Sequence, residues 1–132
     1  MNEQLAKITR ASLEIQERGM LNFWIHVDYE TGLSQGVGGI CLDVYDSDLK
    51  ERVGTAYGCE VIRRLLLELD ANDFSEMKDK MVWVIGEGDG LSFTPKGIRA
   101  LSVNKSSKGV IFDEIAEYMN VKSECKRNKL CE

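Results

Sequence analysis

The stretch MLNFWIHVDY at residues 20–29, followed by ETGLSQGVGG at residues 30–39, decides the fold of this chain. Residues 20–29 place every second side chain, all of them apolar or aromatic, on one face of an extended backbone: Leu21, Phe23, Ile25, Val27 and Tyr29. This period of two predicts a β-strand with one face in the core. The other face is only half polar, because it carries Trp24 and His26, so we expect another element or a partner subunit to cover part of it.

Four of the chain's twelve glycines follow within eight positions, at 32, 36, 38 and 39. Glycine has no Cβ and reaches positive φ freely, so this cluster predicts a backbone that turns sharply or closely approaches a ligand or another backbone. Phosphate-binding glycine loops lie between a strand and a helix, whereas a strand is predicted after this one. We therefore expect a tight hairpin with a bulge, while a nest of amides that holds an anion stays open.

The segments on either side of this hairpin are also predicted strands. Residues 7–16 carry Ile8, Leu13 and Ile15 at extended spacing, and residues 38–45 alternate in the same way. Because short connections join these segments to the strand at 20–29, the three together predict an antiparallel meander.

A helix is predicted from residue 56. Thr55 has the side chain of an N-cap, and the short polar residues at 70–73 favour a turn that ends the helix. The stripe predicted to face the core consists of Cys59, Ile62, Leu66 and Leu69, flanked by Val61 and Leu65.

Two further strands, at residues 81–85 and 97–104, and a short amphipathic helix within 109–120 complete the predicted elements. The predicted fold class is α+β: an antiparallel, strongly twisted sheet of about five strands with one central helix and a short C-terminal helix. We expect a single domain over residues 1–120 and a flexible polar tail over residues 121–132.

Composition limits the classes of function. The chain has 132 residues, is 43% hydrophobic and carries a net charge of −5, so it lacks the basic face of a duplex-DNA-binding protein. It contains no run of 18 apolar residues and no secretory signal pattern, so we expect a soluble, cytoplasmic protein that does not associate with a membrane. Four cysteines without Cys-x-x-Cys spacing and a single histidine favour free thiols, with neither a metal nor a cofactor.

Charge is divided unevenly along the chain. Residues 121–132 carry a net charge of +2, which leaves −7 for residues 1–120. We interpret the tail as a solvated segment rather than a nucleic-acid-binding arm, because its four cations are not consecutive.

The start of the predicted helix is a candidate anion site. Arg52 precedes it, Thr55 caps it, and the first amides of a helix lack intrahelical partners and attract anions. Arg63 and Arg64 on the same helix could add a guanidinium clamp. An ordinary capped helix with a solvated basic face is the alternative interpretation.

Large aromatic side chains, Trp24 among them, are numerous for a small sheet, so an oligomer interface or a surface that stacks a nucleotide base is expected. His26 and Asp28 could serve as a general base with its partner, but no nucleophile motif accompanies them. We therefore interpret His26 as structural and the protein as not an enzyme.

Several motifs together resemble those of a family of small bacteriophage-encoded proteins. They are Glu17-Arg-Gly-Met-Leu, Asp28-Tyr, Gly32, Gln35-Gly-Val-Gly-Gly39, Asp43, Arg52-Val-Gly-Thr-Ala-Tyr-Gly58 and Glu60-Val-Ile-Arg-Arg-Leu. Small accessory proteins of phages are often counter-defence factors, and the chain looks most like the anti-Thoeris sponge proteins. The resemblance implies sequestration, without degradation, of a cyclic ADP-ribose-type signal. Phe112-Asp-Glu-Ile-Ala-Glu departs from the basic, aromatic end expected of relatives.

Three hypotheses follow. The first is a non-catalytic phage protein that sequesters a nucleotide-derived signal: Arg52, Thr55, Arg63 and Arg64 would hold phosphates, and Trp24 or Tyr57 would stack a base. The second is an anti-CRISPR-type inhibitor whose acidic surface mimics nucleic acid and binds a bacterial defence protein. The third is a structural phage accessory protein. A homo-oligomer is expected from the aromatic sheet face.

Overall fold

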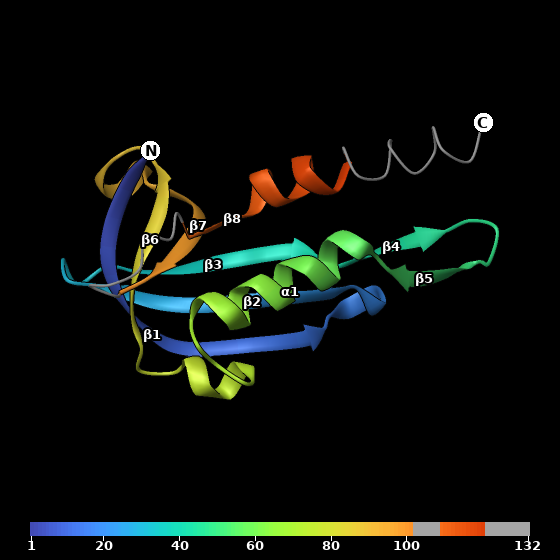
Figure 1. Ribbon diagram of the computed structural model, residues 1–132, viewed down its shortest axis with the longest axis horizontal. Helices are drawn as coiled ribbons and strands as arrows, with labels where there is room; N and C mark the ends of the chain where they lie inside the picture. The colour runs from blue at the N-terminus through green and yellow to red at the C-terminus, as the bar shows by residue number, and fades with distance from the viewer. Residues whose placement is uncertain (102–108, 121–132) are drawn as a thin grey trace.

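The structure, a computed structural model, describes residues 1–101 and 109–120 (Figure 1). The predicted α+β class, the antiparallel sheet and the two helices are confirmed. Six strands form the main sheet in the order β3-β2-β1-β6-β7-β8, against about five predicted, and β4 and β5 form a separate two-stranded sheet. The elements are β1 (Asn2–Ile15), η1 (Glu17–Gly19), β2 (Leu21–Tyr29), β3 (Ser34–Cys41), β4 (Asp43–Asp46), β5 (Glu51–Gly54), α1 (Ala56–Glu68), η2 (Phe74–Met77), β6 (Met81–Glu87), η3 (Gly90–Ser92), β7 (Thr94–Ala100), β8 (Val110–Ile111) and a C-terminal helix over residues 112–120.

The predicted meander is present, since β2 pairs antiparallel with β1 on one side and with β3 on the other. β1 begins at Asn2, well before the predicted start at residue 7. Its first half pairs with β6, which lies far along the chain. This pairing is a tertiary contact, so residues 2–6 carry little local sign of it.

The glycine-rich segment gives a different strand from the one predicted. Gly36, Gly38 and Gly39 lie inside β3, and the pairing with β2 shifts register at the last two, whose φ angles are 116° and 70°. The hairpin with a bulge is therefore confirmed, but the strand predicted over 38–45 is wrong. β3 starts at Ser34 and ends at Cys41. Glycine has no side chain with which to show alternation, so the period of two is hidden over most of this strand.

Residues 43–54 form a hairpin, called the arm below, that extends past the end of the main sheet (Figure 1). β4 pairs with β5 from Asp43 opposite Gly54 to Asp46 opposite Glu51. The predicted elements did not include this hairpin, because the strand predicted over 38–45 took in the first three residues of β4. The arm leads directly into the N-terminus of α1.

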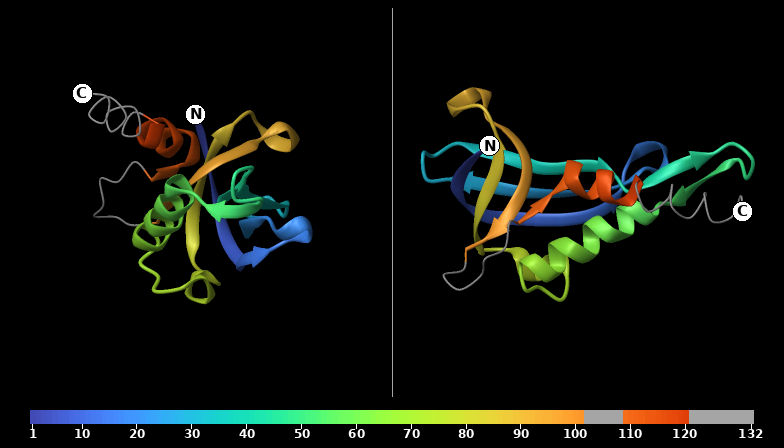
Figure 2. Two further views of the ribbon diagram at one scale, coloured as in Figure 1. Left: turned by 90° about the vertical axis from the view of Figure 1, so that its right-hand side faces the viewer. Right: turned by 45° about the horizontal axis from the view of Figure 1, so that its top comes forward.

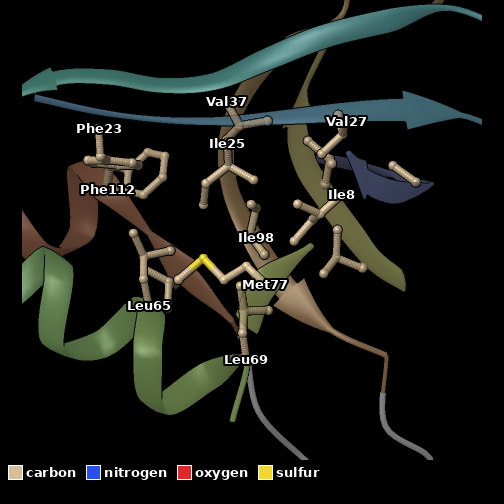
Figure 3. Packing of buried hydrophobic residues seen from close by; sticks show 14 of the residues in the cluster. Ile8, Phe23, Ile25, Val27, Val37, Leu65, Leu69, Met77, Ile98 and Phe112 are labelled. Carbon is tan, nitrogen blue, oxygen red and sulfur yellow. The ribbon is translucent and has the colours of Figure 1, made fainter. Parts of the chain in front are cut away.

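The core lies on one face of the main sheet, between the strands and the two helices (Figures 2 and 3). The predicted inward side chains of β2 are confirmed, since Phe23, Ile25, Val27 and Tyr29 are buried. The predicted stripe of α1 is confirmed in part, since Leu69 is buried and Ile62 and Leu66 are partly buried against the core, whereas Cys59 is exposed. The deepest positions of the helix are Gly58 and the predicted flanking residues Val61 and Leu65.

α1 starts in close contact with the preceding backbone at Gly58. A Cβ built there would lie 2.3 Å from the carbonyl oxygen of Leu42, so only glycine lets the helix start against this backbone. Val61 and Leu65 follow Gly58 at spacings of three and four residues, so all three lie on the same buried face of α1.

A polar bridge on the core side links β2 and β3 to Phe93, the residue before β7. The main sheet is curled (Figure 2). The Tyr29 hydroxyl donates to Gln35 Oε1 at 2.6 Å, and Gln35 Nε2 donates to the carbonyl oxygen of Phe93 at 2.9 Å. The ring of Phe93 also meets Tyr29 edge to face, with centroids 6.1 Å apart. These contacts tie β2 and β3 to the start of β7, so they favour a bent sheet over a flat one.

The C-terminal elements differ in their bounds from the predictions. The strand predicted over 97–104 is β7, which covers Thr94–Ala100, and residues 102–104 lie outside the described residues. Residues 110–111 form β8 because they pair with β7, so the last helix starts at residue 112 rather than at 109. The tail predicted over 121–132 lies outside the described residues. Within the described ranges no helix is both long and apolar enough to cross a membrane.

Candidate functional site

The face of β1, β2 and β3 that points away from the core is the outer face. The strand register places side chains there at alternate positions. Its members are Lys7, Arg10, Ser12 and Glu14 of β1, Asn22, Trp24, His26 and Asp28 of β2, and Ser34, Gly36 and Gly39 of β3. Most of these side chains are polar, and one of them, Asn22 opposite Cys41, is buried.

Trp24 lies across the glycines of β3. A Cβ built on Gly36 would be 2.9 Å from Trp24 Cε3 and Cζ3, and one built on Gly39 would be 2.5 Å from Cη2 and Cζ2. The six-membered part of the indole therefore occupies the space that side chains at these two positions would fill. Two of the four clustered glycines thus serve to hold Trp24 flat against β3.

His26 extends the aromatic surface. Its ring lies 6.2 Å from that of Trp24 between centroids, with an angle of 20° between the two planes. Both side chains are half-buried. We call this pair of nearly parallel rings, with Ser12 as the neighbour of Trp24 on β1, the Trp24–His26 shelf.

Polar groups border the shelf. Ser34 donates its hydroxyl hydrogen to Asp28 Oδ1 at 2.6 Å, and the Thr9 hydroxyl donates to the carbonyl oxygen of His26 at 3.2 Å. Arg10 is exposed beside His26 and forms no ion pair with any described residue. The shelf therefore offers ring stacking and hydrogen bonding on an open surface.

Among the described residues, His26 and Asp28 are not paired as a general base and its partner would be. His26 is stacked on Trp24, and the Asp28 carboxylate accepts a hydrogen bond from Ser34 rather than from the imidazole. In the part of the chain that the structure describes, no three His, Cys, Asp or Glu side chains are grouped as metal ligands would be. Cys41 and Cys59 are exposed free thiols.

The predicted anion site at the start of α1 is largely occupied by the protein itself. The predicted N-cap at Thr55 is confirmed: its hydroxyl accepts from the Gly58 amide at 2.9 Å and donates to the Leu42 carbonyl oxygen at 3.0 Å. Both hydrogen-bonding directions of the hydroxyl are thus in use. Its role in the structure is to fix the helix start against the end of β3.

Arg52 is also engaged. Its Nη2 donates to Asp43 Oδ1 at 2.7 Å, and Asp43 Oδ2 accepts from the Leu21 amide at 3.1 Å. The hydrogen bond from Arg52, helped by the one from Leu21, holds the pKa of Asp43 below its usual value. This partly buried ion pair ties the arm to the start of β2.

The remaining predicted residues on α1 face the C-terminal helix or solvent. The Tyr57 hydroxyl donates to the Phe112 carbonyl oxygen at 3.3 Å, and burial followed by the charge of Asp113 raises the pKa of Tyr57. The Arg64 guanidinium lies 4.9 Å above the ring of Tyr118 and contacts Glu60 at 3.2 Å. Arg63 is exposed and contacts Glu60 at 3.5 Å.

The structure therefore does not bring the six predicted site residues together. Arg52, Thr55, Tyr57, Arg63 and Arg64 belong to the core side and the base of the arm, whereas Trp24 lies on the outer face. Sequence reasoning missed Ser12, Gly36 and Gly39 as neighbours of Trp24. The sequence does contain a large aromatic residue followed by a glycine-rich segment. Which glycines lie beside Trp24, however, depends on the register between β2 and β3.

The arm is a second candidate surface. Val44 is 50% exposed, Tyr45 is 57% exposed and Leu49 is 61% exposed. Its turn is acidic, and the Asp46 carboxylate is held inward by the amides of Asp48 and Leu49. Exposed apolar side chains on a projecting hairpin are typical of a protein-binding element.

Comparison of the chain with protein-family models, with curated proteins and with solved structures finds no match.

Proposed function

We propose that this chain is a non-catalytic binding protein that sequesters a nucleotide-derived signalling molecule, with the flat base of the ligand resting on the Trp24–His26 shelf. The observation that carries the proposal is the packing of Trp24 on Gly36 and Gly39, on a face that the core does not use. The site differs from the helix-start site that the sequence indicates. The ligand class is the same, and it agrees with the counter-defence role in a bacterial cytoplasm that the family resemblance implies.

Three features support this ligand class. A half-buried indole beside an imidazole provides a stacking surface that tolerates any flat heteroaromatic ring. The Ser12 hydroxyl and the two imidazole nitrogens can exchange hydrogen bonds with the edge of a base. The rigid bed of glycines fixes the indole before binding, which lowers the entropy lost on binding.

Calorimetry with cyclic ADP-ribose isomers and cyclic oligonucleotides tests the proposal. Since stacking of one base contributes about 1–3 kcal/mol, Trp24→Ala should raise Kd about tenfold or more. Trp83→Ala is the matched control, because Trp83 lies below Arg99 on β6, away from the shelf. Absence of heat with every one of these ligands would contradict the function.

A second variant pair locates the site. If Arg63→Ala and Arg64→Ala weaken binding while Trp24→Ala does not, the ligand binds at α1 and the shelf assignment is wrong even though the function is right. If only Trp24→Ala weakens binding, the shelf is the site.

The arm favours a second candidate function, inhibition of a defence protein such as a CRISPR effector. A nucleic-acid mimic needs exposed carboxylates on a projecting element, and the arm carries exposed Asp48 and Glu51 beside exposed Tyr45 and Leu49. The test is competition between the protein and guide or target nucleic acid for purified effectors. Asp48→Lys combined with Glu51→Lys should abolish competition, whereas Trp24→Ala should leave it unchanged.

A further inference from the structure

The two halves of β1 have different surroundings. Residues 2–7 pair with β6, and Ile8 exchanges hydrogen bonds with the turn after η2, since its amide donates to Lys80 O at 2.9 Å and its carbonyl oxygen accepts from Asp79 N at 2.7 Å. A bulge at Thr9 follows. From Arg10 to Ile15 the strand pairs with β2 alone among the described elements, so its other side is a free edge.

The register shows which backbone groups this free edge presents. The Gln16 amide donates to the Met20 carbonyl oxygen at 2.8 Å, so the backbone groups of residue 16 point towards β2. The backbone N–H and C=O groups of successive residues in an antiparallel strand point to opposite sides, so those of Arg10, Ser12 and Glu14 point towards β2 as well. The N–H and C=O groups of residues 11, 13 and 15 then point outward, and none of them has a hydrogen-bond partner among the described residues.

The side chains at the same three positions are apolar. Ala11, Leu13 and Ile15 lie on the core face of the sheet, opposite inward-facing residues of β2. Nevertheless Leu13 is 46% exposed and Ile15 is 66% exposed. Open backbone groups beside exposed apolar side chains form an edge that pairs readily with another strand.

We propose that two copies of this chain pair their free edges, residues 11–15, antiparallel about a two-fold axis at Leu13. Leu13 then lies opposite Leu13 of the second copy, and Ala11 lies opposite Ile15. The outward N–H and C=O groups at all three positions are satisfied, and the two main sheets become one continuous sheet. This dimer does not depend on the proposed ligand.

The space beside Ala11 fits this arrangement. A hollow of about 310 Å³ lies between the β1 bulge and η2, and it is lined by Thr9, Arg10, Ala11, Phe74, Ser75 and Lys78. The side chain opposite Ala11 in the proposed pairing is Ile15 of the second copy. Its branched apolar chain would enter this hollow and contact Phe74, which is itself only partly buried.

Charge on the outer face supports a second copy rather than a foreign strand as the occupant. Arg10 and Glu14 form no ion pair with any described residue. In the two-fold register Glu14 is diagonal to both Arg10 and Glu14 of the second copy, at about 7–8 Å between backbones, and the long Arg10 side chain can bridge this distance to form an ion pair. The axis repeats this pair, so one sequence supplies both halves of a self-complementary edge.

Sedimentation of the full chain tests the proposal. We expect twice the mass of one chain for the native protein, and the mass of one chain for Leu13→Lys and Ile15→Lys, which are exposed positions that tolerate a charge in the monomer. Leu49→Lys on the arm is the matched control and should stay dimeric. A native protein that is monomeric up to its solubility limit overturns the proposal, as does a dimer that survives both substitutions.

Two further measurements fix the register. In a chain whose native cysteines are replaced by serine, Leu13→Cys should form an intermolecular disulfide, because paired Cα atoms lie about 5.5 Å apart. Ile15→Cys should not, since the two copies of residue 15 lie about 13 Å apart. Arg10→Glu or Glu14→Arg alone should weaken the dimer, and the double exchange should restore it. Crosslinking through residue 15 alone, or no recovery in the double variant, overturns this register.

Discussion

The two faces of β2 have opposite relations to the rest of the molecule. Phe23 and Trp24 are neighbours in sequence, yet Phe23 is buried against Phe74 and Phe112, whereas Trp24 is half-buried on the glycines of β3. The first face is held by side chains from elements far along the chain. The second is held by neighbouring strands of the same sheet, so truncation there should cost less stability than truncation on the first face.

The largest expected difference between the faces comes from truncating the two aromatic rings. Phe23→Ala leaves a cavity among fully buried side chains and should lower the free energy of unfolding by about 3–5 kcal/mol. Trp24→Ala removes a half-buried ring and should lower it by about 1–2 kcal/mol. Urea denaturation followed by circular dichroism measures both, and equal losses would contradict the assignment of the two faces.

The core face should also show a distinct dependence on pH. Burial raises the pKa of Tyr29 to about 12, from an ordinary value of 10.0. The folded state therefore keeps its proton between these values while the unfolded state loses it, so stability is complete below pH 10 and falls as the pH rises towards 12. The free energy of unfolding should fall by about 2–3 kcal/mol over this pH range.

Tyr29→Phe is the control for this measurement. It removes the ionisable group together with the hydrogen bond to Gln35, so the variant should start less stable but lose less between pH 10 and 12. Parallel stability curves for the two proteins would show that Tyr29 does not cause the loss.

The outer face can be tested through its glycines. Gly39→Ala forces a side chain onto positive φ and onto the Trp24 ring, and should cost about 2 kcal/mol. Gly32→Ala meets nothing within 4 Å, so it should cost only the backbone term of about 1 kcal/mol. In a Trp24→Ala background, Gly39→Ala and Gly32→Ala should lower the free energy of unfolding by equal amounts. A persisting difference would show that Gly39 does not serve to make room for the Trp24 ring.

The smallest effect is expected at the rim of the outer face. Ser34→Ala removes the hydrogen bond to Asp28, which lies in solvent, and should change stability by about 0.5 kcal/mol or less. Thermal unfolding of the variant beside the native protein measures it. A loss as large as that of Gly39→Ala would mean that this rim supports the sheet.

Much of the fold could be predicted because its signals are local. Alternation over residues 20–29 identified β2 and its buried face, and the Thr55 side chain identified the start of α1. The strand over residues 34–41 could not be located in the same way, since three of its eight residues are glycine and show no alternation of side chains. The pairing of β1 with β6 left no trace in either segment alone.

The candidate site was less predictable. Arg52 and Thr55 were chosen because a helix start attracts anions, but the structure gives each of them a partner within the chain. Sequence patterns do not reveal such partners. Asp43 contacts Arg52, and Leu42 contacts Thr55, only because the hairpin of the arm brings its two ends together. Trp24 was identified for its ring alone, without the strand that supports it.

The sequence by itself determined the α+β class, the meander, the capped helix and the buried face of β2, because each depends on the spacing of apolar side chains within one segment. Tertiary structure decided which residues flank Trp24, which cations are already paired, and that β1 ends as a free edge. These features depend on register and on contacts between distant segments, and the same local sequence is compatible with several arrangements of both.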